Sequence, residues 1–468
     1  MRTVDELLAA QKSALRENGA LNYRQRQALL RALAQMLRQH GTALSEAIAR
    51  DFGRRHLRET EIYEIYPLQA EIAYVLGHLR NWVRPRAVHT RWPFLPARSL
   101  IIPQPVGVVG IIGAWNYPLL LTLLPLISAI AAGNRAILKG PRLAPQAMTL
   151  LAQTLRDVTS EDTIALVQGS PDVDHAFPGL PFDHLIFSGA TRTGRVIARA
   201  AARNLVPVTL SMSGKSPAII QRDYPLAAAA RSIMAGKLVN AGQTCIAPDY
   251  CLVATDQCDA FIARAQSATL SLYPHWADNP DYTSIPNGRL WERLDGLLQD
   301  ARGKGALLWQ PSPAPAWPDG AQRPFPPTLL WNVRPGMKIL EEETFGPILV
   351  ILTYDDIQEA LDYVRDHPAP LALYYFDRDQ RRALRHCKGI AAGGLTINDT
   401  IFHVAQPGIP FGGIGLSGIG QYRGIYGFQR LSHYQGVFRQ NRLSACEWVR
   451  PPYGRWTQLL IAWLSRWG

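Results

Sequence analysis

Residues 106–139 read VGVVGIIGAWNYPLLLTLLPLISAIAAGNRAILK and carry no charged side chain before the arginine near the end of the stretch. An uncharged run of this length could cross a bilayer. Three glycines and two prolines interrupt its first two thirds, however, and Asn116 lies near the middle. The pattern instead predicts a buried strand at 106–112, a loop, a buried helix at 119–132 and a second strand at 135–138, all in a water-soluble core.

Strand and helix patterns continue to alternate beyond this stretch. Further β-rich runs at 162–167 and 184–187, separated by helical patterns, indicate a parallel α/β sheet. A second alternating region, 216–398, includes strands predicted at 250–254 and 348–353. The chain is therefore predicted to be an α/β protein with a second sheet-containing lobe.

The residues before this region have a different pattern. Two buried helical faces are predicted in the first eighty residues, the second in a helix that ends near residue 82: Leu29, Leu30, Leu33 and Leu37 on the first face, and Ile62, Ile65, Leu68 and Ile72 on the second. Residues 84–105 are rich in proline and arginine, with short apolar pairs. They predict an extended excursion, a hairpin outside the main lobe.

Composition limits the class of protein. With 468 residues, 47% of them hydrophobic and 18% charged, the chain can bury a large core divided into two or three lobes. Five cysteines form no disulfide framework, and the N-terminus has no apolar signal core, so we expect a cytoplasmic protein.

The formal charge of +12 raises the possibility of nucleic-acid binding. Only seven of the 49 basic residues are lysines and the arginines are scattered, so we expect no nucleic-acid partner.

One cysteine stands in a sequence that suits a nucleophile. Cys245 ends the run Asn240-Ala-Gly-Gln-Thr-Cys, and the Asn116 amide could donate to an oxygen that becomes negative when a thiolate attacks a carbonyl. A single cysteine is more often an inert buried residue, so this interpretation depends on further motifs.

Two other motifs are set aside. The run from Gly413 to Gly418 has dinucleotide-fingerprint spacing but follows no clear strand, and Gly214-Lys-Ser lacks the first glycine of a phosphate loop.

Two segments could hold a phosphorylated cofactor. Phe187-Ser-Gly-Ala-Thr-Arg-Thr-Gly194 follows a predicted strand and opens a helix, so its backbone amides could face a pyrophosphate. Lys139 ends another strand, where the carboxyl edge of a parallel sheet can hold a ribose or phosphate.

Together these motifs resemble the aldehyde dehydrogenase superfamily along nearly the whole chain. The motifs that carry the resemblance are Gly113-Ala-Trp-Asn-Tyr-Pro118, Phe187-Ser-Gly189, Gly236-Lys-Leu-Val-Asn-Ala-Gly-Gln-Thr-Cys245, Glu342-Glu-Thr-Phe-Gly-Pro347 and Pro410-Phe-Gly-Gly413. Cys245-Ile-Ala-Pro-Asp-Tyr250 and Asn398-Asp-Thr-Ile-Phe-His403 are similar to the class 3 branch. Asp281-Tyr-Thr-Ser-Ile285, before Arg289-Leu-Trp-Glu-Arg-Leu294, is similar to bacterial coniferyl aldehyde dehydrogenases.

The resemblance implies an aldehyde dehydrogenase fold: a Rossmann-like parallel-sheet cofactor domain, an α/β catalytic domain and a small β oligomerisation arm, in a homodimer. The implied boundaries are 1–84 and 106–210 for the cofactor domain, 211–397 for the catalytic domain with Cys245, 85–105 and 428–445 for the arm, 398–427 for an active-site segment that returns to the cofactor domain, and 446–468 for an amphipathic tail.

The resemblance also implies roles for single residues. Cys245 would attack the aldehyde, Asn116 and the Cys245 backbone N–H would bind the oxyanion, and hydride transfer to NAD or NADP would leave an acyl-thioester. Positions that match the family motifs imply the other contacts: Lys139, Ser188, Gly189, Gly194, Glu343 and Phe345 for the cofactor, and Tyr117, Phe402 and His403 for the substrate. No metal site is expected.

Two positions depart from the family pattern. Ser211, in Thr209-Leu-Ser-Met-Ser-Gly-Lys-Ser-Pro217, stands where a glutamate activates water for deacylation, and a neutral hydroxyl is a poor base near pH 7. Arg142 stands three residues after Lys139, where a carboxylate normally accepts from the ribose and repels a 2′-phosphate. We therefore expect intact acylation, slow hydrolysis, and NADP binding at least as strong as NAD binding.

The resulting prediction is NAD(P)-dependent oxidation of an aromatic or medium- to long-chain aldehyde. Two alternatives stay open: acyl transfer to or from coenzyme A or another thiol, which needs no water-activating base, and a non-catalytic homologue. The C-terminus adds a further question, because Trp456, Leu459, Leu460, Trp463, Leu464 and Trp467 share one helical face. Residues 456–468 are too few to span a bilayer, so we expect them to pack on protein, where they would cover a substrate entrance, or to lie on a membrane surface.

Overall fold

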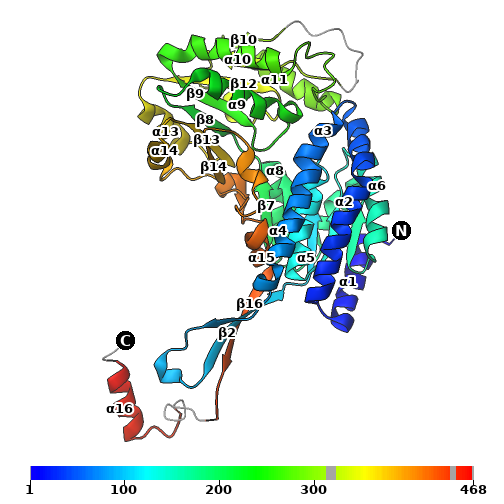
Figure 1. The fold of residues 1–468 in the computed structure, drawn as a ribbon, viewed down its shortest axis with the longest axis vertical. Helices are drawn as coiled ribbons and strands as arrows, with labels where there is room; N and C mark the ends of the chain where they lie inside the picture. Colours follow the sequence, from blue (N-terminus) through cyan, green and yellow to red (C-terminus); the bar gives the residue numbers. More distant parts are fainter. Residues whose placement is uncertain (1, 312–322, 443–449, 466–468) are drawn as a thin grey trace.

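The protein forms two α/β lobes and an arm that projects from them (Figure 1). The computed structural model describes residues 2–311, 323–442 and 450–465. Within these ranges no helix combines the length and the apolar character needed to cross a membrane. The uncharged stretch at 106–134 forms β3 (Val108–Ile112) and α5 (Leu120–Ala132), and both elements lie in the interior of the first lobe.

The first lobe is built on a six-stranded sheet. Its strand order is β15 (Gly418–Ile419), β7 (Val208–Met212), β6 (His184–Gly189), β3, β4 (Arg135–Lys139) and β5 (Ile164–Val167), with all neighbours parallel except β15 and β7. All five residues of β3 and of β4 are buried, as expected for a parallel sheet with both faces covered. The accompanying helices are α1 (Val4–Asn18), α2 (Tyr23–Phe52), α4 (Tyr66–Trp82), α5, α6 (Pro145–Val158), α7 (Pro171–Ala176), η3 (Phe177–Gly179), α8 (Thr191–Ala202) and α15 (Gly424–Arg430).

The second lobe is built on a seven-stranded sheet. Its order is β10 (Leu307–Trp309), β11 (Thr328–Trp331), β12 (Ile348–Tyr354), β9 (Pro248–Ala254), β8 (Ser216–Ile220), β13 (Ala372–Phe376) and β14 (Gly394–Ile397). Only β10 and β11 are antiparallel. Its helices are α9 (Leu226–Leu238), η5 (Thr255–Gln257), α10 (Cys258–Leu272), α11 (Gly288–Gly303), α12 (Lys338–Glu341), α13 (Ile357–Asp366) and α14 (Gln380–Cys387).

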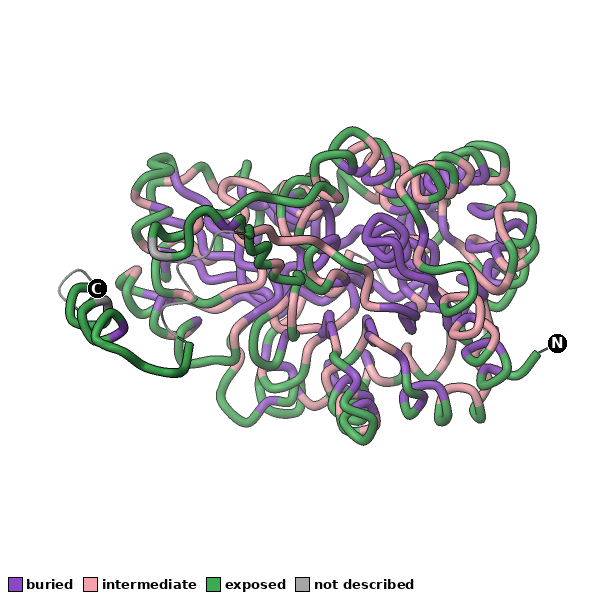
Figure 2. The backbone as a smooth tube through the Cα atoms, turned by 90° about the horizontal axis from the view of Figure 1, so that it is seen from below, coloured by how far each residue is buried: buried purple, intermediate pink, exposed green. Residues whose placement is uncertain are grey.

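The arm is a three-stranded antiparallel sheet that stands apart from both lobes (Figure 1). It contains β1 (Arg86–Val88), η2 (Trp92–Phe94), β2 (Arg98–Pro105) and β16 (Ser432–Arg439), and β16 pairs with β2 along its whole length. The excursion predicted at 84–105 is therefore a hairpin outside the main lobe. Beyond it, α16 (Arg455–Leu464) touches the arm through Trp463, whose ring lies 4.3 Å from that of Trp92. Figure 2 shows α16 as almost entirely exposed.

The structure corrects one of the predicted helical faces. Ile65, Leu68 and Ile72 are buried, but Ile62 is 55% exposed. The reason is a π-helical turn, η1 (Glu61–Ile65), inserted between α3 (Leu57–Thr60) and α4. A π turn bonds i to i+5 and so places one extra residue in the turn, which moves Ile62 off the buried face. The domain boundaries stay a prediction, and residues 443–449 and 466–468 of the predicted arm and tail lie outside the described part of the chain.

Candidate active site

Cys245 lies in a strained loop between α9 and β9. Three consecutive residues, Asn240, Ala241 and Gly242, have positive φ angles of 51°, 50° and 72° within the short turn η4 (Val239–Gly242). A Cβ at Gly242 would lie 2.2 Å from the Gly346 carbonyl oxygen, so only glycine fits there. Non-glycine residues in this conformation cost stability and cluster at functional sites. The loop holds Thr244 and Cys245 at the wall of a cavity.

The Asn116 motif interlocks with this loop. The Asn116 side-chain Nδ2 donates to the Gln243 carbonyl (3.0 Å), and the Asn116 carbonyl accepts from Asn240 Nδ2 (3.0 Å). The next residue repeats the link, because the Tyr117 and Thr244 hydroxyls are 2.8 Å apart. Two motifs predicted separately from the sequence are thus joined by three side-chain hydrogen bonds, which place the Asn116 amide beside the nucleophile's segment.

A buried arginine forms a hydrogen bond to the Asn116 loop. Arg55 Nη1 donates to the Asn116 carbonyl (3.2 Å) and forms an ion pair with Glu64 Oε1 (3.2 Å), and both of these charged side chains are fully buried. Glu64 Oε2 in turn accepts from the backbone N–H groups of Leu119 and Leu120 at the start of α5. Removing the arginine would leave Glu64 buried without its ion-pair partner, which is strongly destabilising.

The Cys245 thiol is protonated at neutral pH in this structure. Burial, and next the negative charge of Glu343, raise the pKa of Cys245 to about 12, while the backbone N–H groups of Cys245 and Ile246 oppose the rise. Those two N–H groups are donors for negative charge at this position. Attack on a carbonyl therefore requires a group that accepts the thiol proton.

Glu343 is half-buried and lies beside a buried polar cluster formed by Lys237, Asp249 and Thr344. Lys237 Nζ donates to Thr344 Oγ1 (2.9 Å), Asp249 Oδ1 accepts from Thr344 N (2.9 Å), and Lys215 pairs with Asp249. Burial, and next the charge of Asp249, raise the pKa of Glu343 to about 8, against the effect of Ser213 and the lysines. Burial also lowers the pKa of Lys237 to about 8. Both groups therefore titrate close to physiological pH.

Ser211 is surrounded by hydroxyls rather than by carboxylates. It is 4% exposed in β7, where it pairs in register with Ser188 of β6 and Gly418 of β15. The Tyr422 hydroxyl lies beside Ser188 and Ser211. Among the described residues these hydroxyls lie near one another, but the geometry at Ser188 Oγ and Tyr422 Oη does not make a hydrogen bond. The position at which the resemblance implies a general base therefore has no group that accepts a proton near pH 7.

The cavity beside Cys245 is narrow and mostly apolar, with a volume of about 180 Å³. Of the three predicted substrate residues, Tyr117 and Phe402 line it, but His403 does not, because its Nδ1 bonds to Thr396 Oγ1 (2.9 Å) on β14. The cavity walls come from distant segments: Ile62, Tyr63, Tyr66, Pro67, Tyr117, Leu120, Leu121, Leu124, Thr244, Cys245, Ile246, Ile401, Phe402, Val404, Ala405, Phe411, Tyr422 and Arg423. A larger cavity of about 470 Å³, near Cys258 and Tyr363, includes none of the residues predicted to act in the site.

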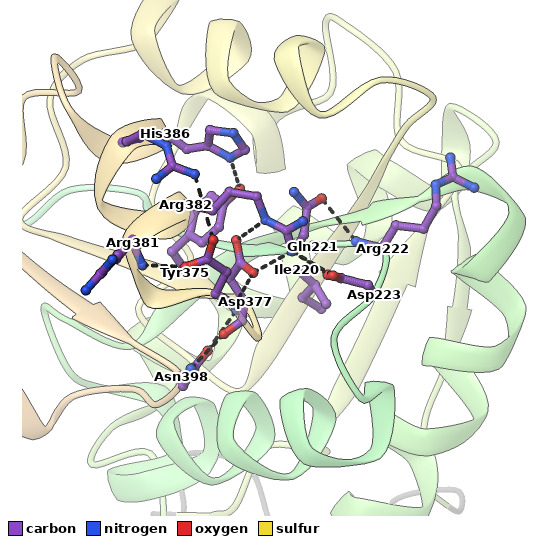
Figure 3. A network of polar contacts seen from close by, with 12 residues as sticks. Ile220, Gln221, Arg222, Asp223, Tyr375, Asp377, Arg381, Arg382, His386 and Asn398 are labelled. Atoms are coloured by element: carbon purple, nitrogen blue, oxygen red, sulfur yellow. Dashed lines mark hydrogen bonds and ion pairs between the residues drawn. The ribbon is translucent and has the colours of Figure 1, made fainter.

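A polar network holds the start of the segment 398–402, which leads from β14 to Phe402 in the cavity wall (Figure 3). Asn398, with a φ of 64°, accepts from Asp377 N (2.7 Å) and donates to the Asp377 carbonyl (2.8 Å). The fully buried Asp377 carboxylate binds Arg382 through Nε (2.8 Å) and Nη2 (2.6 Å), and Arg382 also binds Asp223. The chain therefore leaves β14 in a fixed direction, toward η6 (Phe402–Ala405).

Residues 1–437 match the aldehyde dehydrogenase family. The chain belongs to that family. It is 44% identical to a probable coniferyl aldehyde dehydrogenase of Pseudomonas aeruginosa over 458 residues, 98% of this chain and 95% of that protein. It is also 37% identical to the mouse aldehyde dehydrogenase family 3 member A2, over 90% of this chain and 85% of that protein. The substrate-bound AldH of Staphylococcus aureus superposes with a TM-score of 0.92 at 33% identity, covering 99% of this chain and all of that one. These matches confirm the predicted family and fold.

Members of the aldehyde dehydrogenase family use NAD or NADP, and the residues of the first lobe fit such a cofactor. Lys139 at the end of β4 and Ser188 and Gly189 at the end of β6 share the carboxyl edge of the parallel sheet, where ligands bind in this class of fold. Ser188 Oγ is buried with no described partner. A Cβ at Gly194 would lie 2.3 Å from Met212 Sδ, so α8 packs closely against β7.

The structure gives Arg142 a partner that the sequence did not reveal. Arg142 Nε lies 2.7 Å from Asp174 Oδ2, and Lys139 Nζ pairs with the other oxygen of the same carboxylate. Asp174 comes from α7, 32 residues after Arg142 in the sequence, and no motif pointed to it. The cations near the predicted ribose position are therefore not free but share one carboxylate.

Proposed function

We propose that this enzyme oxidises an aromatic or medium- to long-chain aldehyde with NAD or NADP, through an acyl-thioester on Cys245. The observation that carries the proposal is the placement of the Cys245 thiol at the wall of an apolar cavity, in a loop bonded to the Asn116 motif. The names of the coniferyl relatives support an aromatic aldehyde. The aliphatic and aromatic walls suit either an aryl ring or an alkyl chain.

The chain's own groups account for most of the first half-reaction. Apolar walls exclude water from the aldehyde, and the Cys245 sulfur adds to its carbonyl carbon as the thiol proton passes to the carboxylate of Glu343, the charged group that acts on this thiol. Asn116 Nδ2 and the Cys245 N–H are the donors for the oxygen that becomes negative. Bound NAD or NADP would supply the hydride acceptor. Lys139, Ser188 and Gly189 would hold the cofactor in the first lobe, and Glu343 and Phe345, before β12, would contact it from the second.

A second candidate is acyl transfer between Cys245 and a thiol such as coenzyme A, in either direction. It is favoured by the surroundings of Ser211, because the described groups beside it are the hydroxyls of Ser188 and Tyr422. A thiol acceptor reacts as its own thiolate and needs no base at that position. Incubation with a panel of aldehydes and either cofactor, with and without coenzyme A, separates the two activities. If the cofactor is reduced only when coenzyme A is present, the activity is acyl transfer.

We expect the rate of deacylation to rise with pH through about 8 if Glu343 replaces the missing base. Only the carboxylate form accepts a proton, and burial keeps Glu343 protonated below about pH 8. The measurement is single-turnover decay of the acyl-enzyme from pH 6 to 9. Glu343→Gln should remove the rise, whereas an unchanged profile would assign the ionisation to Lys237, whose pKa lies in the same range.

We expect NADP to bind at least as well as NAD. Lys139 and Arg142 contribute two positive charges and Asp174 one negative charge, so the group keeps a net charge of +1 toward a 2′-phosphate. Calorimetric titration of both cofactors should show a gain in NADP affinity of about tenfold in Asp174→Asn and a loss in Arg142→Glu. A strong preference of the wild type for NAD that neither substitution alters would place these residues outside the cofactor site.

The proposed partners are a small aldehyde or acyl thioester and a second copy of the chain, which would pair through the exposed arm. The cytoplasmic location remains a proposal too.

On α16, the exposed side chains of Trp456, Leu459 and Ile461 would contact a partner subunit or a membrane surface. Within one chain α16 lies at the far end of the arm, so it does not cover its own subunit's cavity (Figure 1). Co-sedimentation of the protein with liposomes, with and without residues 456–468, distinguishes contact with a membrane surface from contact with a partner subunit.

A further inference from the structure

The segment that carries Glu343 and Phe345 has no regular structure of its own. It lies between α12 and β12, and residues 343–345 make no backbone–backbone hydrogen bond within the described part of the chain. Phe345 has a φ of 45°, which is disfavoured for a residue with a side chain. Such a segment keeps one conformation only where side chains bind its backbone groups.

Two cations hold the carbonyl groups of this segment. Arg293 of α11 donates through Nη1 to the Glu343 carbonyl (3.2 Å) and through Nη2 to the Thr344 carbonyl. Lys215, in the loop between β7 and β8, donates to the Glu342 carbonyl (3.0 Å). Hydrogen bonds from charged donors are stronger than those from neutral ones, so three consecutive carbonyl groups have fixed positions.

Asp249 joins this segment to the chain that carries the nucleophile. Its Oδ1 accepts from the Thr344 N–H (2.9 Å) and from the Thr344 hydroxyl, and its Oδ2 pairs with Lys215. Lys237 Nζ lies 3.9 Å from Oδ1. Asp249 is 2% exposed and stands four residues after Cys245, at the start of β9. One buried carboxylate therefore connects the chain just after the proposed nucleophile to the middle of the segment.

The carboxyl group of Asp249 is ionised in this cluster. Burial acts to raise its pKa, but the charges of Lys215 and Lys237, together with the hydrogen bond from Thr344, hold the pKa below its usual value. Asp249 therefore stays a charged acceptor throughout the pH range in which Glu343 titrates.

We propose that Asp249 is a positioning residue that sets the placement of the cofactor against the Cys245 sulfur. Its bonds to Thr344 hold Glu343 and Phe345 at a fixed distance from the chain that carries the nucleophile. This inference rests on the proposed function, in which those two residues contact NAD or NADP. Hydride transfer is sensitive to such placement, because a shift of about 1 Å at a reacting centre can cost about 10²-fold in rate.

The first test follows cofactor reduction in a single turnover, with enzyme in excess over aldehyde. Asp249→Asn keeps the shape of the side chain but removes the charge that pairs with Lys215, and the rate should fall by about 10²-fold. Deuterium in place of the aldehyde hydrogen should slow this variant further, because that hydrogen is the one transferred. Thr344→Val removes only the hydroxyl and should slow the reaction less, whereas Thr344→Ser should restore the wild-type rate.

Tyr354→Phe is the matched control. It removes a buried hydrogen bond from the Tyr354 hydroxyl to the Ile220 carbonyl (2.6 Å), at the far end of β12. It should lower the unfolding temperature and leave the single-turnover rate unchanged. Thermal unfolding checks that each variant folds, and Thr344→Val decides alone if Asp249→Asn does not fold. A wild-type rate in the folded variants, or a slowed reaction that deuterium does not affect, would overturn the inference.

Cofactor binding separates this inference from the proposed function, because it needs no aldehyde. NAD or NADP, whichever binds the wild type more tightly, is titrated calorimetrically into Cys245→Ala with and without Asp249→Asn. The affinity should fall by about tenfold, as when a charge-assisted contact is lost. If the affinity falls but no aldehyde is oxidised, the role of Asp249 stands and the proposed function fails. If aldehydes are oxidised while affinity and single-turnover rate are unchanged, the proposed function stands and the role of Asp249 fails.

Discussion

Replacing Cys245 with alanine is expected to abolish aldehyde-dependent reduction of NAD or NADP, with a loss in kcat of roughly 10⁴-fold or more, as for other covalent nucleophiles. Alanine removes the sulfur that is proposed to hold the acyl group, while the surrounding loop is fixed by the bonds between Asn116, Asn240 and Gln243. Absorbance at 340 nm, followed with saturating cofactor and aldehyde, measures the effect.

Cys251→Ala is the matched control. Cys251 lies six residues further on in β9, fully buried in the core of the second lobe, with a sulfur that the reaction does not reach. Its replacement should lower stability by about 1 kcal/mol and leave the chemistry in place. Full activity in Cys245→Ala, or equal losses in the two variants, would contradict the proposed nucleophile.

Rapid mixing of the wild type with aldehyde and cofactor is expected to give a burst of reduced cofactor close to one per active site, followed by slow turnover. The proposed acylation would use Cys245 and Asn116, whereas hydrolysis would meet a hydroxyl at Ser211. Ser211→Glu should raise the steady-state rate by roughly 10²- to 10⁴-fold, the usual contribution of a general base. The new carboxyl would stand where the Tyr422 hydroxyl lies within reach.

Ser211→Gln controls for size, since it fills the same space but accepts no proton at neutral pH. It should retain the burst and the slow turnover. Rapid steady turnover in the wild type without a burst, combined with no response to Ser211→Glu, would show that hydrolysis uses another base. Glu343 would then be the residue to replace first.

The candidate site residues that the sequence singled out lie in contiguous motifs. Asn116 and Cys245 each stand in a run whose backbone shape needs particular residues, such as the glycine at 242 that packs on Gly346, and their catalytic roles stay a prediction. The parallel sheets followed from uncharged strands that must be buried on both faces, such as β3. In both cases the physical constraint acts on neighbouring residues and is visible as a pattern.

The features that the sequence did not predict depend on residues brought together from distant segments. Asp174 meets Arg142 and Lys139 only because α7 packs beside the end of β4. Arg423 meets Glu71 across more than 350 positions, and neither residue stands in a run that marks it. Ile62 was placed on a buried face because helical periodicity assumes 3.6 residues per turn, which the π turn at 61–65 breaks.

The bonds between the Asn116 loop and the Cys245 loop also bear on how the enzyme ages and inactivates. They join a loop of the first lobe to a loop of the second, so the proposed nucleophile keeps its position beside Asn116 only while the two lobes keep their relative placement. On heating, a small shift of one lobe relative to the other should abolish catalysis while each sheet is still intact. Activity is therefore a more sensitive gauge of damage than loss of secondary structure, and a fully folded preparation can be catalytically dead.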